Sequence, residues 1–240
     1  MLSAHSAINL EKDDYMSIPR LPVILLAVMT ALPLSSSGQP GKSNNIDTFS
    51  GYWKHKVDQF RTLPNPEGEI CFLGDSITDG CNWTELIGDL RVTNRGISSD
   101  TCWGIVKRLD EVTEGKPAKV FLMIGTNDLD RDKTVPQVRE KIGEIIDTIK
   151  RDSPATEIYL QSVLPVIDFA WGSRNNATID EMNGELEKLA EAKKVTWVNL
   201  NPWFKDENGA LRRDLTEEGL HINGRAYYLW YSLIRKYLPR

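Results

Sequence analysis

Ser76 lies where a buried strand is expected to give way to a turn. The preceding apolar run, residues 70–73, has no polar alternation and predicts a strand covered on both faces of a sheet. Gly74 permits a tight turn, and Asp75 is expected to shape it by accepting hydrogen bonds from nearby backbone N–H groups. In an open α/β sheet, ligands bind at this edge. The alternative is that Asp75 or Ser76 only caps the helix that follows.

A serine at this position needs a base, because its hydroxyl is a weak nucleophile until its proton is taken. Histidine is the usual base near neutral pH, and the sequence contains three. His5 lies in the predicted leader segment, and His55 lies between lysines on an expected solvent-facing helix. His221 is therefore the candidate base, and Glu218 is placed to orient its imidazole. The alternative is a histidine that caps or packs the last helix.

Two further turns supply candidate donors for the negative charge that develops when a serine attacks an ester carbonyl. The N–H of Ser76, the N–H of Gly96 and the side-chain amide of Asn127 could converge on one point. Each such donor typically contributes about 3 to 4 kcal/mol of transition-state stabilisation. Taken alone, Gly96 and Asn127 would be ordinary turn residues. Their recurrence after successive strands favours a shared oxyanion hole.

Strands alternate with helices along the chain, which predicts parallel strands with right-handed crossovers and helices on both faces. The three polar turns then meet at one edge of the sheet. The strands are expected at residues 70–73, 91–94, 119–124, 157–160 and 195–198. The helices are expected at residues 46–63, 83–90, 101–112, 135–151, 179–193 and 223–237.

The composition is that of one soluble α/β domain, expected over residues 46–240. The chain has 240 residues, of which 40% are hydrophobic and 26% charged, with a formal net charge of −5. Without a basic excess, nucleic acid is not an expected partner, and no polybasic membrane patch is present. The oligomeric state is left open.

The N-terminal segment resembles a secretory signal. Residues 21–34 form an apolar stretch that is too short to span a bilayer, with an arginine before it and small residues after it. We expect residues 1–38 to be a signal peptide with an upstream extension, translation to start at Met16, and residues 39–45 to be a linker. The mature protein would be periplasmic or extracellular, without a membrane span. The alternative is an apolar helix that the mature protein keeps.

The three cysteines do not define a metal site, because their spacing is not that of zinc ligands. Cys71 is expected to be a buried strand residue. Cys81 and Cys102 both lie near the predicted active edge, and whether they pair is left open.

Four short motifs together resemble the SGNH or GDSL hydrolases, a family of esterases and lipases with a flavodoxin-like sheet. The resemblance covers the whole predicted mature chain and is most similar to secreted carbohydrate acetylesterases and to the platelet-activating-factor acetylhydrolase-like branch. It implies an α/β, three-layer flavodoxin-like sandwich with a mainly parallel five-stranded sheet. The motifs are Gly74-Asp75-Ser76, Asn94-Arg95-Gly96, Gly125-Thr126-Asn127-Asp128 and Glu218-Gly219-Leu220-His221.

By this resemblance Ser76 is the nucleophile, His221 is the base, and Ser76, Gly96 and Asn127 form the oxyanion hole. The chain departs from the family at Glu218, where an aspartate is usual. Glutamate serves as the acid in some α/β-hydrolase triads, so activity is expected to be retained. Asp214 and a backbone carbonyl are the other candidates for supporting the histidine.

The resemblance implies an esterase that removes small acyl groups, acetyl above all, from carbohydrates, without a metal or organic cofactor. Four tryptophans are candidate sugar-stacking walls, although each could instead belong to the core. One alternative is a lysophospholipase or thioesterase. Another is a glycan-binding relative that has lost catalysis. The tryptophans are Trp83, Trp103, Trp171 and Trp203. Ser99 stands where relatives often have a second glycine, a difference that would stiffen or narrow the site.

Overall fold

A computed structural model of the chain describes residues 49–168 and 171–239. The predicted signal peptide, the start at Met16 and the linker at residues 39–45 lie outside the described residues and stay predictions. Among the described residues, none of the helices combines the length and the apolar character that crossing a membrane requires.

The described residues form one five-stranded parallel sheet, as predicted, in the order β2-β1-β3-β4-β5. This is the flavodoxin-like order. Gly74 pairs in register with Gly96 on one side and with Met123 on the other, so three strands end at the same level. The strands are β1 (Ile70–Gly74), β2 (Val92–Gly96), β3 (Lys119–Met123), β4 (Glu157–Gln161) and β5 (Thr196–Val198).

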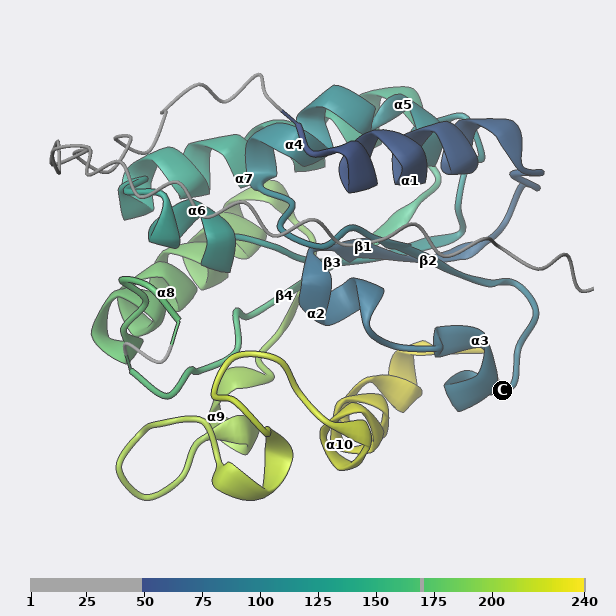
Figure 1. Cartoon of the computed structure of the whole chain (residues 1–240). Helices are drawn as coiled ribbons and strands as arrows, with labels where there is room; N and C mark the ends of the chain where they lie inside the picture. The colour runs from purple at the N-terminus through teal and green to yellow at the C-terminus, as the bar shows by residue number, and fades with distance from the viewer. Residues whose placement is uncertain (1–48, 169–170, 240) are drawn as a thin grey trace, which may run out of the picture. The chain divides into compact units, whose positions relative to one another are not determined.

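Helices cover both faces of the sheet and complete three layers (Figure 1). One face carries α1 (Gly51–Thr62), α4 (Cys102–Arg108), α5 (Asp110–Thr113) and α7 (Val135–Asp152). The other carries α3 (Trp83–Ile87) and α10 (Gly224–Ile234), while α8 (Asn176–Lys193) packs against α7. Shorter elements are α2 (Ser76–Asp79), α6 (Thr126–Asp130), α9 (Asn201–Phe204), η1 (Arg213–Leu215) and η2 (Arg235–Tyr237).

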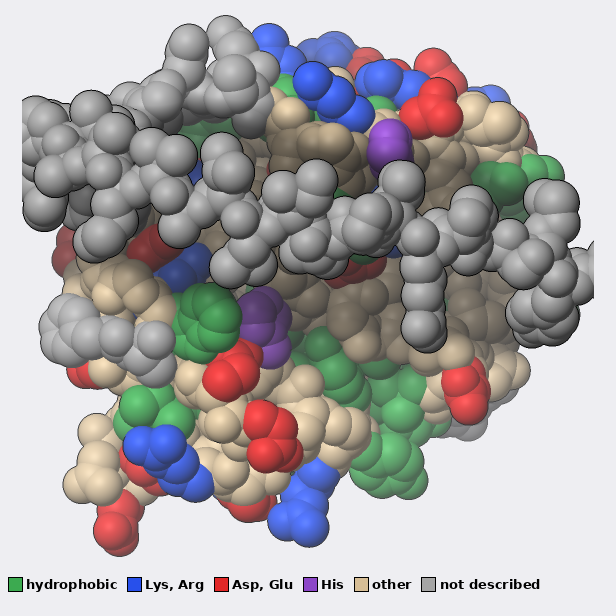
Figure 2. Space-filling view, in the orientation of Figure 1, with side chains coloured by type: hydrophobic (Ala, Val, Ile, Leu, Met, Phe, Trp, Pro, Cys, Tyr) green, Lys and Arg blue, Asp and Glu red, His purple; other side chains and the backbone are tan. Residues whose placement is uncertain are grey.

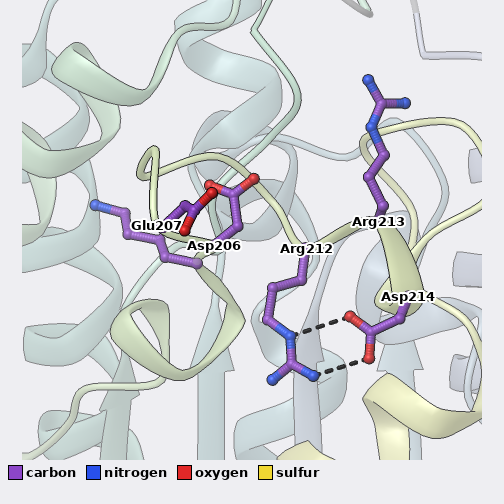
Figure 3. A pocket seen from close by; sticks show the side chains of 6 residues that line it. Asp206, Glu207, Arg212, Arg213 and Asp214 are labelled. Carbon is purple, nitrogen blue, oxygen red and sulfur yellow. Dashed lines mark hydrogen bonds and ion pairs between the residues drawn. The ribbon is translucent and has the colours of Figure 1, made fainter.

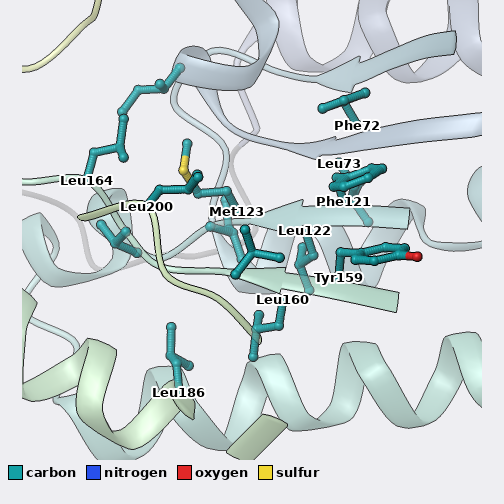
Figure 4. Close-up of a cluster of buried hydrophobic side chains, with 14 of the residues drawn as sticks. Phe72, Leu73, Phe121, Leu122, Met123, Tyr159, Leu160, Leu164, Leu186 and Leu200 are labelled. Carbon is teal, nitrogen blue, oxygen red and sulfur yellow. The ribbon is translucent and has the colours of Figure 1, made fainter. Parts of the chain in front are cut away.

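The central strands are buried on both faces, which explains their unbroken apolar sequence. Phe72, Phe121 and Tyr159 stand side by side on three adjacent strands, and their ring centroids are 4.9 and 4.6 Å apart (Figure 4). Trp83 continues this stack at 3.9 Å from Phe72 and is only 1% exposed. Trp83 is therefore a core residue and is excluded as a sugar-stacking wall.

A buried arginine joins the carboxyl ends of two strands. The Arg108 guanidinium donates to the carbonyls of Gly74 and Arg95, at 3.3 and 2.8 Å. It also donates to the carboxylates of Asp100 and Glu111, at 2.9 and 2.8 Å. Paired charges of this kind are costly to break, because removing one partner leaves the other unpaired inside the protein. The network fixes the loop after β2 relative to the end of β1.

The cysteines remain unpaired in this structure, so the open question about Cys81 and Cys102 is answered. Both are buried free thiols, as is Cys71. Burial raises the pKa of the Cys81 thiol to about 12, which keeps it protonated and unreactive near neutral pH.

The surface carries charges of both signs. Figure 2 shows acidic and basic side chains interspersed over the visible face. This mixture agrees with the modest net charge of −5.

Candidate active site

Two of the predicted site residues follow β1 and β3, the two strands between which the strand order reverses. In doubly wound α/β sheets, ligands bind in the crevice at this switch point, outside the carboxyl ends of the strands. Ser76 opens α2 directly after β1, and Asn127 lies in α6 directly after β3. The topology therefore places both residues where a ligand would bind.

The turn between β1 and α2 positions the Ser76 side chain. Asp75 is the N-cap of α2, and its Oδ1 accepts a hydrogen bond from the Ile77 N–H at 2.9 Å. The Ser76 N–H belongs to the first turn of the helix and so lacks an intrahelical acceptor. Asp75 has the turn-shaping contact that the sequence predicts, while Ser76 stays partly exposed at the end of the sheet.

Ser76, His221 and Glu218 form a continuous chain of hydrogen bonds. His221 Nε2 lies 3.0 Å from Ser76 Oγ, and His221 Nδ1 lies 2.6 Å from Glu218 Oε1. An ionised carboxylate only accepts, so Nδ1–H donates to Glu218 and Nε2 is left to accept from the serine hydroxyl. Glu218 Oε1 also accepts from the His221 backbone N–H at 2.7 Å. This geometry suits a serine activated by a histidine base.

Asp214, the alternative acid, is engaged elsewhere. Its two carboxylate oxygens accept from Arg212 Nε and a terminal nitrogen of that guanidinium, at 3.1 and 2.8 Å. Figure 3 shows this pair among the side chains of the 205–214 segment that line a pocket. The contact of Glu218 with His221 Nδ1 likewise leaves no need for a backbone carbonyl in that role.

Asn127 is held on both sides of its amide group. Its Nδ2 donates to the Asp100 carbonyl at 2.9 Å, and its Oδ1 accepts from an Arg174 guanidinium nitrogen at 2.8 Å. The amide nitrogen carries a second hydrogen, which is available to an oxyanion. Gly125 at the start of this turn has a φ of +129°, a conformation that favours glycine.

Gly96 ends β2 beside the α2 turn, and its role as an oxyanion donor stays a prediction. In this structure its N–H donates to Asn94 Oδ1 at 2.8 Å. A Cβ at Gly96 would lie 2.2 Å from the Asp79 backbone nitrogen, so glycine is needed here for close packing of β2 against α2. Further along this loop, Ser99 has a φ of 64°, which glycine adopts more readily than serine.

Among the remaining candidate tryptophans, Trp171 is the one that contacts the triad. Its ring lies 6.0 Å from the His221 ring in an edge-on arrangement, and its Nε1 donates to the Glu218 carbonyl at 3.1 Å. Trp171 is 48% exposed. Trp103 instead packs partly buried beneath lysines, and Trp203 is exposed on α9.

Two contributors to the site are missing from the sequence-based set. Arg174 lies in the loop before α8, where an arginine is usually solvent-exposed, and no spacing in the sequence points to Asn127. Asn94 is two residues before Gly96 in a recognised motif, so its contact with the Gly96 N–H is local. Its Nδ2 also donates to the Thr78 and Asp79 carbonyls, at 3.1 Å each, and these contacts depend on the close approach of β2 and α2. The Arg174 contact and these contacts between β2 and α2 have no local sequence signal.

Within the described ranges, the side chains form no cluster of three or more histidine, cysteine or acidic residues that could hold a metal ion. The proposed triad chemistry draws on side-chain and backbone groups alone.

Burial of Asp75 predicts a specific pH dependence of stability. Loss of hydration raises the pKa of this carboxyl to about 7. Between about pH 4 and pH 7 the unfolded chain loses this proton while the folded chain keeps it, so the free energy of unfolding falls as pH rises. Asp75→Asn removes the titration and retains an acceptor for the Ile77 N–H. We expect the free energy of unfolding of the variant, compared with that of the wild type, to rise by on the order of 2 kcal/mol from pH 4.5 to pH 7.5.

Urea unfolding at several pH values measures this difference. Asp58→Asn, at an exposed position on α1, is the matched control and should follow the wild-type pH dependence. If the free energies of unfolding of wild type and Asp75→Asn changed with pH in parallel, Asp75 would not titrate in this pH range.

Comparison with known proteins places this arrangement in a class of hydrolases. The sequence profile of the GDSL-like Lipase/Acylhydrolase family matches residues 72–229, from within β1 to within α10. The chain therefore belongs to this family and is an acyl-hydrolase enzyme, as the sequence motifs predict.

Several known proteins and solved structures are similar to this chain. Platelet-activating factor acetylhydrolase IB subunit alpha2 of Rattus norvegicus is 27% identical over 169 residues, covering 67% of this chain and 72% of that protein. N-acylneuraminate cytidylyltransferase of Escherichia coli O18:K1:H7 is 28% identical over 194 residues, covering 79% of this chain but only 44% of that protein. The structure of a GDSL-like lipase from Bacteroides thetaiotaomicron is 26% identical, covers 77% of this chain and 96% of that chain, and has a TM-score of 0.68.

Proposed function

We propose that this enzyme is a serine esterase that removes small acyl groups, acetyl foremost, from carbohydrates. The observation that carries the proposal is the hydrogen-bonded chain from Ser76 Oγ through His221 to Glu218, at 3.0 and 2.6 Å. Similarity to platelet-activating factor acetylhydrolases supports acetyl as the acyl group. The exposed Trp171 ring beside His221 supports a carbohydrate as the alcohol.

The reaction follows from these positions. His221 Nε2 takes the proton of Ser76 as Oγ bonds to the acyl carbon, and the carbonyl electrons move to oxygen. The Ser76 N–H and the free Asn127 Nδ2–H stabilise that oxyanion. When the tetrahedral centre collapses, the alcohol oxygen leaves with the proton from Nε2. Water then attacks the acyl-enzyme by the same route, which releases the acid and restores Ser76.

Hydrolysis of 4-nitrophenyl acetate, butyrate and octanoate by the purified protein tests the acyl preference. Among these three esters, the proposal predicts the highest kcat/KM for the acetate. It also predicts a higher kcat/KM for acetylated sugars than for simple acetate esters. A preference for octanoate would instead favour the lysophospholipase or thioesterase alternative. Absence of turnover on these esters and on acetylated sugars would favour the glycan-binding alternative.

We extend the proposal to an exported enzyme acting in the periplasm or outside the cell. It depends on the signal-like segment at residues 1–38, which lies outside the described residues.

Trp171 is predicted to select the alcohol part of the ester. The leaving oxygen must lie beside His221 Nε2 to receive its proton, so the Trp171 ring flanks the leaving group. We expect Trp171→Ala to raise KM for an acetylated monosaccharide by about 3- to 10-fold, as loss of one aromatic contact predicts, with a smaller effect on ethyl acetate.

Acetate release measured by pH-stat on both substrates gives the comparison. Trp171→Phe is the matched control, because it keeps an aromatic ring, although a smaller one, and loses the N–H that reaches the Glu218 carbonyl. It should retain the preference for the sugar ester. Equal losses on the two substrates for Trp171→Ala would contradict a role in leaving-group selection.

A further inference from the structure

A buried arginine outside the triad contacts the candidate oxyanion hole. Arg174 precedes α8 by two residues, and its side chain is only 7% exposed. One terminal guanidinium nitrogen donates to Asn127 Oδ1 at 2.8 Å, and the other donates to the Trp171 carbonyl at 2.7 Å. Asp130 Oδ1 lies 3.5 Å from that second nitrogen. The guanidinium thus faces the Asn127 amide.

This contact determines which end of the Asn127 amide serves the reaction. The arginine has only donors, so it must face the amide oxygen, and the amide nitrogen must face the other way. The Asp100 carbonyl confirms that orientation by accepting one Nδ2 hydrogen at 2.9 Å. The second Nδ2 hydrogen is then held in a fixed direction. Without Arg174, the amide could rotate and present its oxygen, which would repel an oxyanion.

The charge of Arg174 also matters where acidic side chains surround the site. Asp75, Asp100 and Asp128 are each at most 2% exposed. Burial raises the pKa of Asp75, the charges of Asp100 and Asp128 add to this, and Arg174 opposes it. The positive charge of Arg174 therefore lowers the pKa of Asp75, the residue next to Ser76. A positive charge hydrogen-bonded to Oδ1 also polarises the amide and strengthens its N–H as a donor.

We propose that Arg174 is a positioning residue that orients and polarises the Asn127 amide as an oxyanion-hole donor. The inference deepens the proposed function and rests on it, since it requires a reaction at Ser76 that develops an oxyanion. It assigns Arg174 an effect on the transition state that is exerted through Asn127.

A purely structural role makes a different prediction. Arg174 also holds the loop through the Trp171 carbonyl and Asp130, and Trp171 in turn contacts Glu218. If Arg174 acted only on this loop, its removal would disturb the triad, and the effect would be independent of Asn127.

A double-mutant cycle separates the two roles. The variants are Arg174→Met, Asn127→Ala and the combination, with kcat and KM measured on 4-nitrophenyl acetate. We expect Arg174→Met to lower kcat by about 10- to 100-fold with little change in KM, and Asn127→Ala to lower it by about 100- to 1000-fold. The combination should be no worse than Asn127→Ala alone, because Arg174 acts through that amide.

Controls and a second readout make the test specific. Arg61→Met removes an exposed arginine paired with Asp110 and should keep wild-type kinetics. Asp130→Asn weakens the loop contact without touching Asn127 and should have the smaller effect. A methyl trifluoromethyl ketone forms a tetrahedral oxyanion adduct with an active serine, so its Ki should rise in Arg174→Met in parallel with the fall in kcat/KM.

The outcomes distinguish this inference from the proposed function. Additive losses in the double variant, or wild-type kcat in Arg174→Met, would overturn the positioning role while leaving the esterase intact. An unchanged Ki for the ketone in a folded Arg174→Met would do the same. A wild-type protein without Ser76-dependent turnover would overturn both.

Discussion

Replacement of Ser76 by alanine is expected to lower kcat on 4-nitrophenyl acetate by about 10⁴-fold or more. The variant lacks the atom that bonds to the acyl carbon, and the remaining donors alone supply only residual catalysis. Among the described residues, the Ser76 side chain hydrogen-bonds with His221 Nε2 alone, so removing the hydroxyl should alter the free energy of unfolding little. Stopped-flow or initial-rate measurements of nitrophenolate release give the comparison.

Covalent labelling provides an independent readout of the same prediction. A fluorophosphonate should form one adduct on Ser76 of the wild type, detected by peptide mass spectrometry, and none at that position in Ser76→Ala. Ser232→Ala is the matched control, because Ser232 is an exposed serine on α10 whose hydroxyl donates to the Leu229 carbonyl. It should keep full turnover and labelling. Turnover that survives in Ser76→Ala would refute the serine mechanism.

The strands of this fold could be predicted from sequence because they are central and parallel. Buried strands such as Lys119–Met123 read as apolar runs, and the polar turns that follow them read as breaks. Parallel pairing then brings those turns to one edge, so the sequence alone associates Ser76 with Asn127. The approximate bounds of the long helices also followed from periodicity.

Contacts between separate elements could not be predicted in the same way. Gly96 ends β2 against α2, where a Cβ would lie 2.2 Å from the Asp79 backbone nitrogen, and this close approach of two backbones has no signal in the sequence. Trp83 follows the turn that holds Ser76, a position typical of a surface aromatic, yet it stacks on Phe72 in the core. The expected helix at 101–112 divides at Leu109, between α4 and α5. Such outcomes depend on packing geometry, which residue type and spacing do not encode.

The candidate acid, Glu218, shows which parts of the site the sequence could predict. The order of residues placed Glu218 three positions before His221, and Asp214 remained an alternative. The structure separates them because Asp214 pairs with Arg212, while Glu218 reaches both the imidazole and the backbone N–H of His221. One carboxylate oxygen therefore holds the ring and its own turn together. Glutamate is one methylene longer than the usual aspartate, and its carboxylate reaches both groups of a residue three positions later in the chain.

Replacement of Glu218 by glutamine is expected to lower kcat by about 10²- to 10⁴-fold, the second largest effect predicted. Glutamine can still accept from the His221 backbone N–H, so the turn should remain folded. It carries no charge to stabilise the imidazolium, and its amide can donate to Nδ1 and so favour the tautomer with a proton on Nε2. That tautomer cannot accept the proton of Ser76.

Kinetics and proton NMR together test this assignment. The Nδ1 proton bonded to Glu218 should give a far-downfield resonance in the wild type that is lost in Glu218→Gln. Glu218→Asp keeps the charge but is one methylene shorter, so it should lose contact with Nδ1 or with the backbone N–H and retain intermediate activity. Asp214→Asn is the control and should leave both readouts unchanged, since Asp214 is paired with Arg212 away from the imidazole. Wild-type kcat in Glu218→Gln would show that His221 works without this acid.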